Sequence, residues 1–106
     1  MAVKRIDARP QAKLDVDDAI DYLLLEAGEG AALAFTDALQ STLEQIAAFP
    51  ASGSNRYAHQ LGLPGLRVCP VKTYPYLVFY MARPDHIDVW RVLHAQRDIP
   101  EELAGP

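Results

Sequence analysis

The chain has 106 residues, of which 50% are hydrophobic and 23% are charged, and its formal net charge is −4 at pH 7. This composition excludes a disordered chain and predicts a single globular domain over residues 1–106. The negative charge argues against non-specific binding of nucleic acid, which needs an excess of basic side chains. Because no apolar run is long enough for a signal peptide or a membrane span, we expect a cytoplasmic protein without a membrane partner.

The charge is unevenly distributed along the chain. Residues 1–53 carry four basic and nine acidic side chains, a net charge of −5, whereas residues 54–106 carry six basic and five acidic ones, a net charge of +1. The three histidines, His59, His86 and His94, also lie in the second half. An anionic partner would therefore meet the C-terminal half. Three scattered histidines without a carboxylate cluster do not predict a metal site.

The first elements are expected to be a short edge strand and a helix. Residues 3–6 are the predicted strand, and Pro10 is suited to the first position of a helix, where no backbone N–H is needed. Gly28 is placed to end this helix. Its apolar residues recur at helical spacing and form one stripe: Ala12, Val16, Ala19, Ile20, Leu23 and Ala27. Leu24 and Leu25 widen the stripe, so the helix contacts both the sheet and a neighbouring helix, or else it offers a partner surface.

A second helix is predicted over residues 31–48, where Phe35, Leu39, Leu43 and Ile46 form its apolar stripe and Pro50 prevents its continuation. The short connection around Gly28 predicts an antiparallel helical hairpin. Residues 50–55 have the composition of a loop, and residues 56–62 are expected to be an irregular or short helical connection.

Residues 66–98 predict three antiparallel strands. In residues 76–81, Leu77, Phe79 and Met81 alternate with Tyr76, Val78 and Tyr80, so both faces need cover. Residues 82–86 have turn chemistry. Residues 87–94 alternate in the same way. One face of this strand is expected to carry Ile87, Val89, Arg91 and Leu93, and the other face Asp88, Trp90, Val92 and His94. Asp98 and Pro100 fit the start of a short C-terminal helix.

The expected fold class is α+β, in the order β-α-α-β-β-β with a short C-terminal helix. The N-terminal strand lies at an edge, and the helical hairpin packs on one face of a small antiparallel sheet. The other face is expected to be partly open. Because an exposed tryptophan is costly, Trp90 is either part of the helix-facing core or covered by a binding partner.

Several pieces of the sequence, in this order and spacing, resemble the ParE branch of the RelE/ParE toxin superfamily. They are Ala12-x-x-Asp15-Val16-x-x-Ala19-Ile20-x-Tyr22-Leu23, Phe49-Pro50-x-x-Gly53, Gly65-Leu66-Arg67, Tyr74-Pro75-Tyr76-Leu77-Val78-Phe79-Tyr80 and Val92-Leu93-His94-x-x-Arg97-Asp98. The resemblance implies the toxin component of a type II toxin–antitoxin module. Its implied partner is a ParD-like antitoxin of the ribbon-helix-helix DNA-binding type, in a hetero-oligomer where this chain itself does not contact DNA.

The resemblance leaves two toxic activities open. One is inhibition of DNA gyrase by direct protein binding, without a cofactor. The other is RelE-type cleavage of messenger RNA on the ribosome. For this activity the resemblance implies Arg67 and Arg97 as candidate catalytic residues, and His94 is a candidate acid or base because the ordinary pKa of imidazole is near neutrality. The lysine cluster that precedes the equivalent of Arg67 in RelE-like toxins is absent here, as is a C-terminal tyrosine, so gyrase inhibition is favoured. A third possibility is an inactive toxin that acts only as a co-repressor with its antitoxin.

The expected partner contacts lie along the hairpin and the sheet edge, at residues that are apolar, aromatic or basic: Val3, Arg5, Leu24, Tyr80, Trp90 and Arg91. The alternative is purely structural. Arg67 and Arg91 would then bridge strands or pair with Asp88 or Asp98, and Asp98 would cap the last helix.

Overall fold

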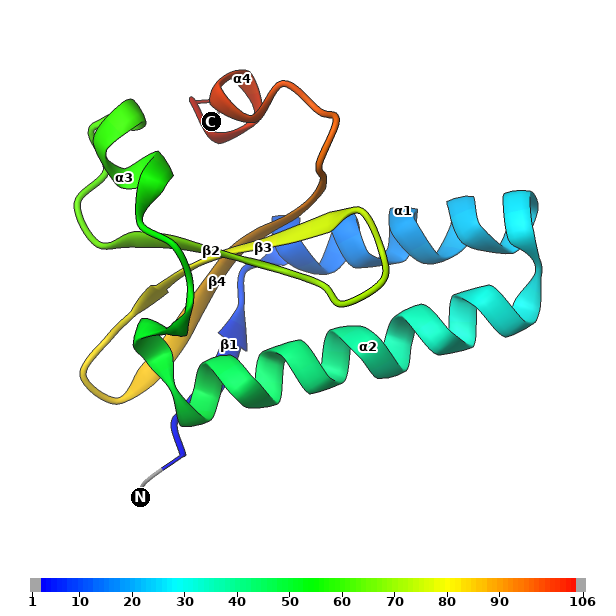
Figure 1. Cartoon of the computed structure of the whole chain (residues 1–106), viewed down its shortest axis with the longest axis horizontal. Coiled ribbons are helices and arrows are strands. Elements are labelled where there is room, and N and C mark those ends of the chain that lie inside the picture. The colour runs from blue at the N-terminus through cyan, green and yellow to red at the C-terminus, as the bar shows by residue number, and fades with distance from the viewer. Residues whose placement is uncertain (1–2, 105–106) are drawn as a thin grey trace.

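The computed structural model describes residues 3–104, in which a four-stranded sheet lies between two layers of helices (Figure 1). Residues 1–2 and 105–106 of the predicted domain lie outside this range. The elements are β1 (Arg5–Ala8), α1 (Pro10–Ala27), α2 (Glu29–Ala48), the 3-10 helix η1 (Pro50–Ser52), α3 (Arg56–Leu61), β2 (Leu66–Pro70), β3 (Tyr76–Ala82), β4 (His86–His94) and α4 (Ile99–Ala104). None of the described helices has both the length and the apolar character needed to cross a membrane.

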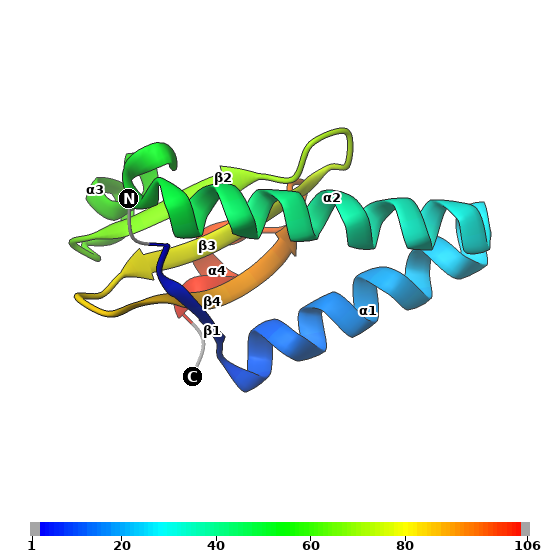
Figure 2. The ribbon, with the colours of Figure 1, turned by 90° about the horizontal axis from the view of Figure 1, so that it is seen from below.

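The predicted helical hairpin is confirmed. α1 begins at Pro10, and Gly28 ends it with a positive φ of 91° and a backbone N–H that donates to the Leu23 carbonyl. Gly28 is also the residue before α2, which therefore starts at Glu29, two residues earlier than predicted. Figure 2, seen from below, shows the two helices running antiparallel, with α2 in front of the sheet.

The sheet has the strand order β1-β4-β3-β2. β2, β3 and β4 are antiparallel, as expected, whereas β1 joins β4 in parallel. The sheet is therefore mixed, which corrects the expectation for its N-terminal strand. β1 also starts two residues later than predicted, because Ile6 pairs with Ile87 and Ala8 with Val89, and this register adds two apolar side chains to the helix-facing core.

β4 contains an irregularity that the period-2 pattern did not predict. Phe79 pairs with Arg91 and Tyr80 with Val89, so Trp90 is an extra residue on β4, as in a β-bulge. The alternation changes face at this point. Val92 is consequently buried in the helix-facing core together with Val89. The prediction that Val89 and Val92 lie on opposite faces of the strand was therefore wrong.

Two apolar clusters fill the two faces of the sheet. The cluster facing α1 and α2 contains, among others, Ala12, Ala19, Phe35, Leu39, Ile46, Tyr76, Val78, Tyr80 and Val92. The opposite cluster contains Leu66, Val68, Phe79, Leu93 and Ile99, with Trp90 packed against it. The expectation of an open second face was wrong, because α3 covers it with Tyr57 and α4 with Ile99 and Leu103 (Figure 1).

Candidate functional site

Arg67 holds the loop that follows α2. Its Nη1 donates to the carbonyl oxygens of Gly53 at 2.7 Å and Ala51 at 3.4 Å. The Tyr80 hydroxyl lies at the same loop, where it donates to the Pro50 carbonyl at 2.7 Å and accepts the Gly53 N–H at 3.0 Å. Burial raises the pKa of Tyr80. The two side chains therefore act together as supports of residues 50–53.

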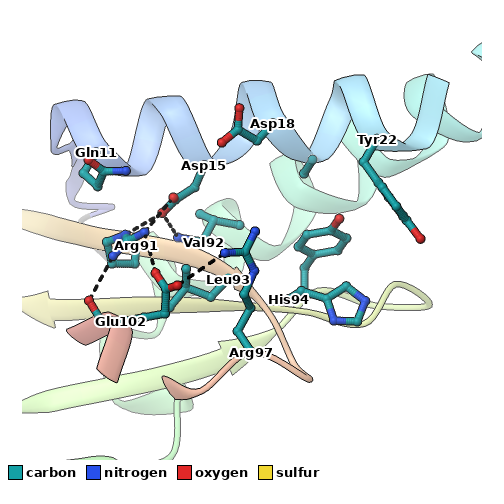
Figure 3. A pocket seen from close by; sticks show the side chains of 12 residues that line it. Gln11, Asp15, Asp18, Tyr22, Arg91, Val92, Leu93, His94, Arg97 and Glu102 are labelled. Carbon is teal, nitrogen blue, oxygen red and sulfur yellow. Dashed lines mark hydrogen bonds and ion pairs between the residues drawn. The ribbon is translucent and has the colours of Figure 1, made fainter. Parts of the chain in front are cut away.

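A polar cleft of about 490 Å³ opens between α1, β4 and α4 (Figure 3). Arg91 forms its inner wall and donates to Asp15 at 2.8 and 2.9 Å, and to the carboxylate and the carbonyl of Glu102 at 3.2 and 3.1 Å. Asp15 is buried and also accepts the backbone N–H of Val92. The hydrogen bond to Asp15 raises the pKa of Arg91. Arg91 thus connects α1, β4 and α4, and its guanidinium group forms its hydrogen bonds within the chain.

The outer part of this polar cleft carries His94 and Arg97, with Tyr22 and Tyr76 nearby (Figure 3). His94 Nδ1 accepts the Gln96 N–H at 3.1 Å, so a neutral ring carries its proton on Nε2. The Arg97 side chain is 59% exposed and pairs with Glu102 at 3.3 Å. These two groups could contact an anion, next to the exposed ring of Tyr22, on which a planar group can stack.

Trp90 belongs to an ion-pair cluster at the β1 side of the sheet. Its Nε1 donates to Asp88 at 3.2 Å, and the Arg9 guanidinium lies 4.4 Å from the centre of its ring. Arg9 and Arg83 each donate to Asp88 at 3.0 Å. Burial alone would raise the pKa of Asp88, but the hydrogen bonds from Arg9 and Arg83 outweigh it and lower this pKa to about 2.

An apolar trough, here called the β1 trough, runs between β1 and the helical hairpin. It consists of two hollows of about 450 and 540 Å³, both of which are lined by Ile6 and Leu43. Val3 lines one hollow and is 68% exposed. Ala12, Val16 and Leu39 line the other. Within residues 3–104, β1 is hydrogen-bonded to a strand only on its β4 side, so the trough lies beside a free strand edge.

The family model described as the ParE toxin of the type II toxin–antitoxin system, parDE, matches residues 6–99. The chain belongs to the ParE toxin family.

Among solved structures, the ParE-family fold is seen in a chain described as the chromosomal ParDE toxin–antitoxin system from P. aeruginosa. The TM-score is 0.73 over 89% of this chain and 98% of that chain, at 16% sequence identity. At this identity the likeness shows a shared fold. A search of curated proteins finds no match.

The structure of this ParE-family toxin separates the three candidate catalytic residues. His94 and Arg97 share the polar cleft, whereas Arg67 lines a different hollow beside α3 and is bonded to the 50–53 loop. Arg67 therefore fits the structural interpretation. Asp98 also has a structural position, since its Oδ1 accepts the Glu101 N–H and caps α4.

The residues expected to contact partners fall into two groups. Val3 and Leu24 are exposed, and Arg5 is exposed and paired with Asp7. Tyr80 is fully buried, so its side chain is not accessible to a partner. Trp90 and Arg91 are partly buried in ion-pair networks of the chain itself.

Sequence reasoning did not identify Arg9 and Arg83 as the partners of Asp88. Its structural alternative offered Arg67 or Arg91 for that role, but Arg67 donates to the 50–53 loop and Arg91 pairs with Asp15. The position of Asp15 on the buried stripe of α1, one turn after Ala12, was a signal that could have shown a buried carboxylate needing a cation.

Proposed function

We propose that this ParE-family toxin inhibits DNA gyrase by direct protein binding and is neutralised by a cognate ParD-like antitoxin. The match of the family model to residues 6–99 is the observation that carries the proposal. The separation of Arg67 from His94 and Arg97 supports a binding function over RNA cleavage, as does the net charge of −4, which disfavours ribosomal RNA as a partner.

The antitoxin is proposed to occupy the β1 trough. An apolar hollow beside a free strand edge suits a segment that adds to the sheet through its backbone and fills the hollow with its side chains. Val3 and Ile6 would contact this segment, and Arg5 would lie at its margin. Leu24, the partner contact predicted on the hairpin, does not line either hollow of the trough and is not assigned to this segment.

The decisive experiment measures supercoiling by purified gyrase in the presence of the free toxin. We expect supercoiling to fall as toxin is added and to recover when the antitoxin is added. Cells that express the toxin alone should stop growing, and co-expression of the antitoxin should restore growth. Normal growth on induction would instead indicate an inactive toxin that acts as a co-repressor.

The second candidate function is ribosome-dependent cleavage of messenger RNA, and one observation favours it. His94 and Arg97 lie together in the polar cleft beside the exposed Tyr22, on whose ring a nucleotide could stack while its phosphate contacts the Arg97 guanidinium. Mapping of message ends on toxin-treated ribosomes tests it. Codon-specific cuts that disappear in the variants His94→Ala and Arg97→Ala would establish cleavage and reject gyrase as the main target.

A further inference from the structure

Leucine side chains are exposed at the closed end of the helical hairpin. Leu24 and Leu25 precede the turn at Gly28, and Leu33 follows it. Leu25 is 87% exposed, Leu33 60% and Leu24 44%, although burial of each leucine would be favourable. We call these three residues and the carboxylates around them the hairpin-tip surface. Exposed leucines gathered in one region are typical of an interaction site.

The charge of the hairpin restricts the partner that fits this surface. α1 and α2 carry seven exposed carboxylates and one exposed basic side chain, Lys13. Four of these carboxylates lie within four positions of a tip leucine: Asp21, Glu26, Glu29 and Asp37. The other three, Asp17, Asp18 and Glu44, lie farther along the helices, and Asp17 and Glu44 line the β1 trough. None of the seven forms an ion pair within residues 3–104, whereas Asp7 and Asp88 on the sheet and the buried Asp15 all do. Their negative potential repels nucleic acid, acidic proteins and a second copy of this chain.

We propose that the hairpin-tip surface binds a basic amphipathic helix of another protein, whose leucine-like side chains contact Leu24, Leu25 and Leu33 and whose lysines or arginines meet the surrounding carboxylates. Helix-on-helix contact buries the leucines, and the charge complementarity selects the partner. The inference does not depend on gyrase inhibition or on the antitoxin.

This hairpin-tip surface is separate from the β1 trough. Leu33 is near the start of α2, while Ala47 and Ala48, which line the trough, are at its end. The nearest residues that line the trough are Leu39, six positions from Leu33 on α2, and Asp17, seven positions from Leu24 on α1. At 1.5 Å per residue, about 9 Å of helix or more separates the leucines from the trough. The two surfaces therefore have different lining residues.

The experiment measures binding of a synthetic amphipathic helix to the full chain by titration calorimetry. The peptide is as long as α1, 18 residues, with leucines on one face and lysines on the other. The control peptide has glutamate at each lysine position. We expect the lysine peptide to bind, the glutamate peptide not to bind, and binding to weaken as salt is raised.

Variants then locate the site. Replacing both tip leucines, Leu25→Ala and Leu33→Ala, should weaken binding about tenfold or more, because their contacts are lost. Val3→Ala removes an equally exposed apolar side chain from the β1 trough and should leave binding unchanged. The proposal is overturned if the lysine peptide does not bind, if the glutamate peptide binds as tightly, or if Val3→Ala has the larger effect. Circular dichroism of each variant checks that the fold is retained.

Discussion

At position 53, glycine is required by the atoms around it and not by its backbone angles. Its φ is −76°, which any residue can adopt. A Cβ atom at this position would lie 2.6 Å from the Tyr80 hydroxyl oxygen and 3.0 Å from the Val68 carbonyl oxygen. The glycine in the Phe49-Pro50-x-x-Gly53 motif is thus required because the loop passes directly against β2 and β3.

We expect Gly53→Ala to lower the free energy of unfolding by about 1–3 kcal/mol, since Tyr80 must move and its hydrogen bonds to the loop weaken. The matched control is Gly30→Ala in α2, where a Cβ meets nothing within 4 Å. That change should raise the free energy of unfolding by about 0.5–1 kcal/mol through helix propensity. Urea denaturation of both variants measures these effects, and equal stabilities would contradict the role of Gly53.

Asp88 predicts a loss of stability in acid. Its pKa in the folded protein is about 2, below the ordinary value of 3.8. A group whose pKa is lowered by folding contributes stability above its unfolded pKa and loses it as the pH falls toward the folded value. The contribution should be up to about 2 kcal/mol at pH 7 and should disappear between about pH 4 and pH 2.

Asp88→Asn measures this contribution. The variant should be less stable than the wild type at neutral pH, and the difference should shrink below pH 4. Urea unfolding followed by circular dichroism at several pH values gives the two curves. If the difference stayed constant with pH, the interactions of the Asp88 carboxylate with Arg9 and Arg83 would not be the cause.

At the scale of elements, the Arg91 network connects three segments that are far apart in the sequence. Asp15 is on α1, Arg91 on β4 and Glu102 on α4, and both side chains of the central pair are largely buried (Figure 3). α4 is only six residues long and could not form a stable helix alone in water. The network and the apolar contacts of Ile99 and Leu103 therefore decide its position.

We expect Arg91→Gln to lower the free energy of unfolding by about 3 kcal/mol, because Asp15 would keep a buried charge without its cation. Arg5→Gln is the matched control, since the Arg5–Asp7 pair is exposed and should contribute about 0–1 kcal/mol. Thermal and urea denaturation compare the two. A control as destabilising as Arg91→Gln would show that burial of the pair is unimportant.

At the scale of the whole molecule, both faces of the sheet are covered and the open surfaces lie at the margins. The β1 trough lies beside the edge strand β1. Figure 2 shows β1 at one margin of the sheet and the turn between α1 and α2 at the far end of the hairpin. The opposite sheet edge is less accessible, because Ser54 bonds to both backbone groups of Val68 and Pro70 has no N–H. The strand addition that we propose for the antitoxin is therefore expected at β1.

If the antitoxin occupies the β1 trough, Val3→Asp should weaken its binding at least tenfold, since a charge would enter an apolar contact. Leu33→Asp is the matched control, because Leu33 is also exposed but lies at the other end of α2. Binding measured by surface plasmon resonance separates the two. Equal affinities of both variants would place the antitoxin elsewhere.

The sequence alone determined the elements and the family. Pro10, Gly28 and Pro50 mark the limits of the two helices, and the alternation in residues 76–81 gave the correct two faces of β3. The helical stripes predicted most of the buried residues, although Ala27 is exposed and Asp15 is buried. These features are local, because each depends on residues within a few turns or strand positions. The motif order over the chain was enough to identify the ParE family.

Only the tertiary structure decided which distant residues meet. It placed Trp90 as an extra residue in β4, paired Asp15 with Arg91 across 76 positions, and directed Arg67 to the 50–53 loop instead of to His94 and Arg97. It also brought β1 beside β4 in parallel and closed the second face with α3 and α4. Such pairings depend on strand register and on packing between segments, and sequence spacing contains no information about either.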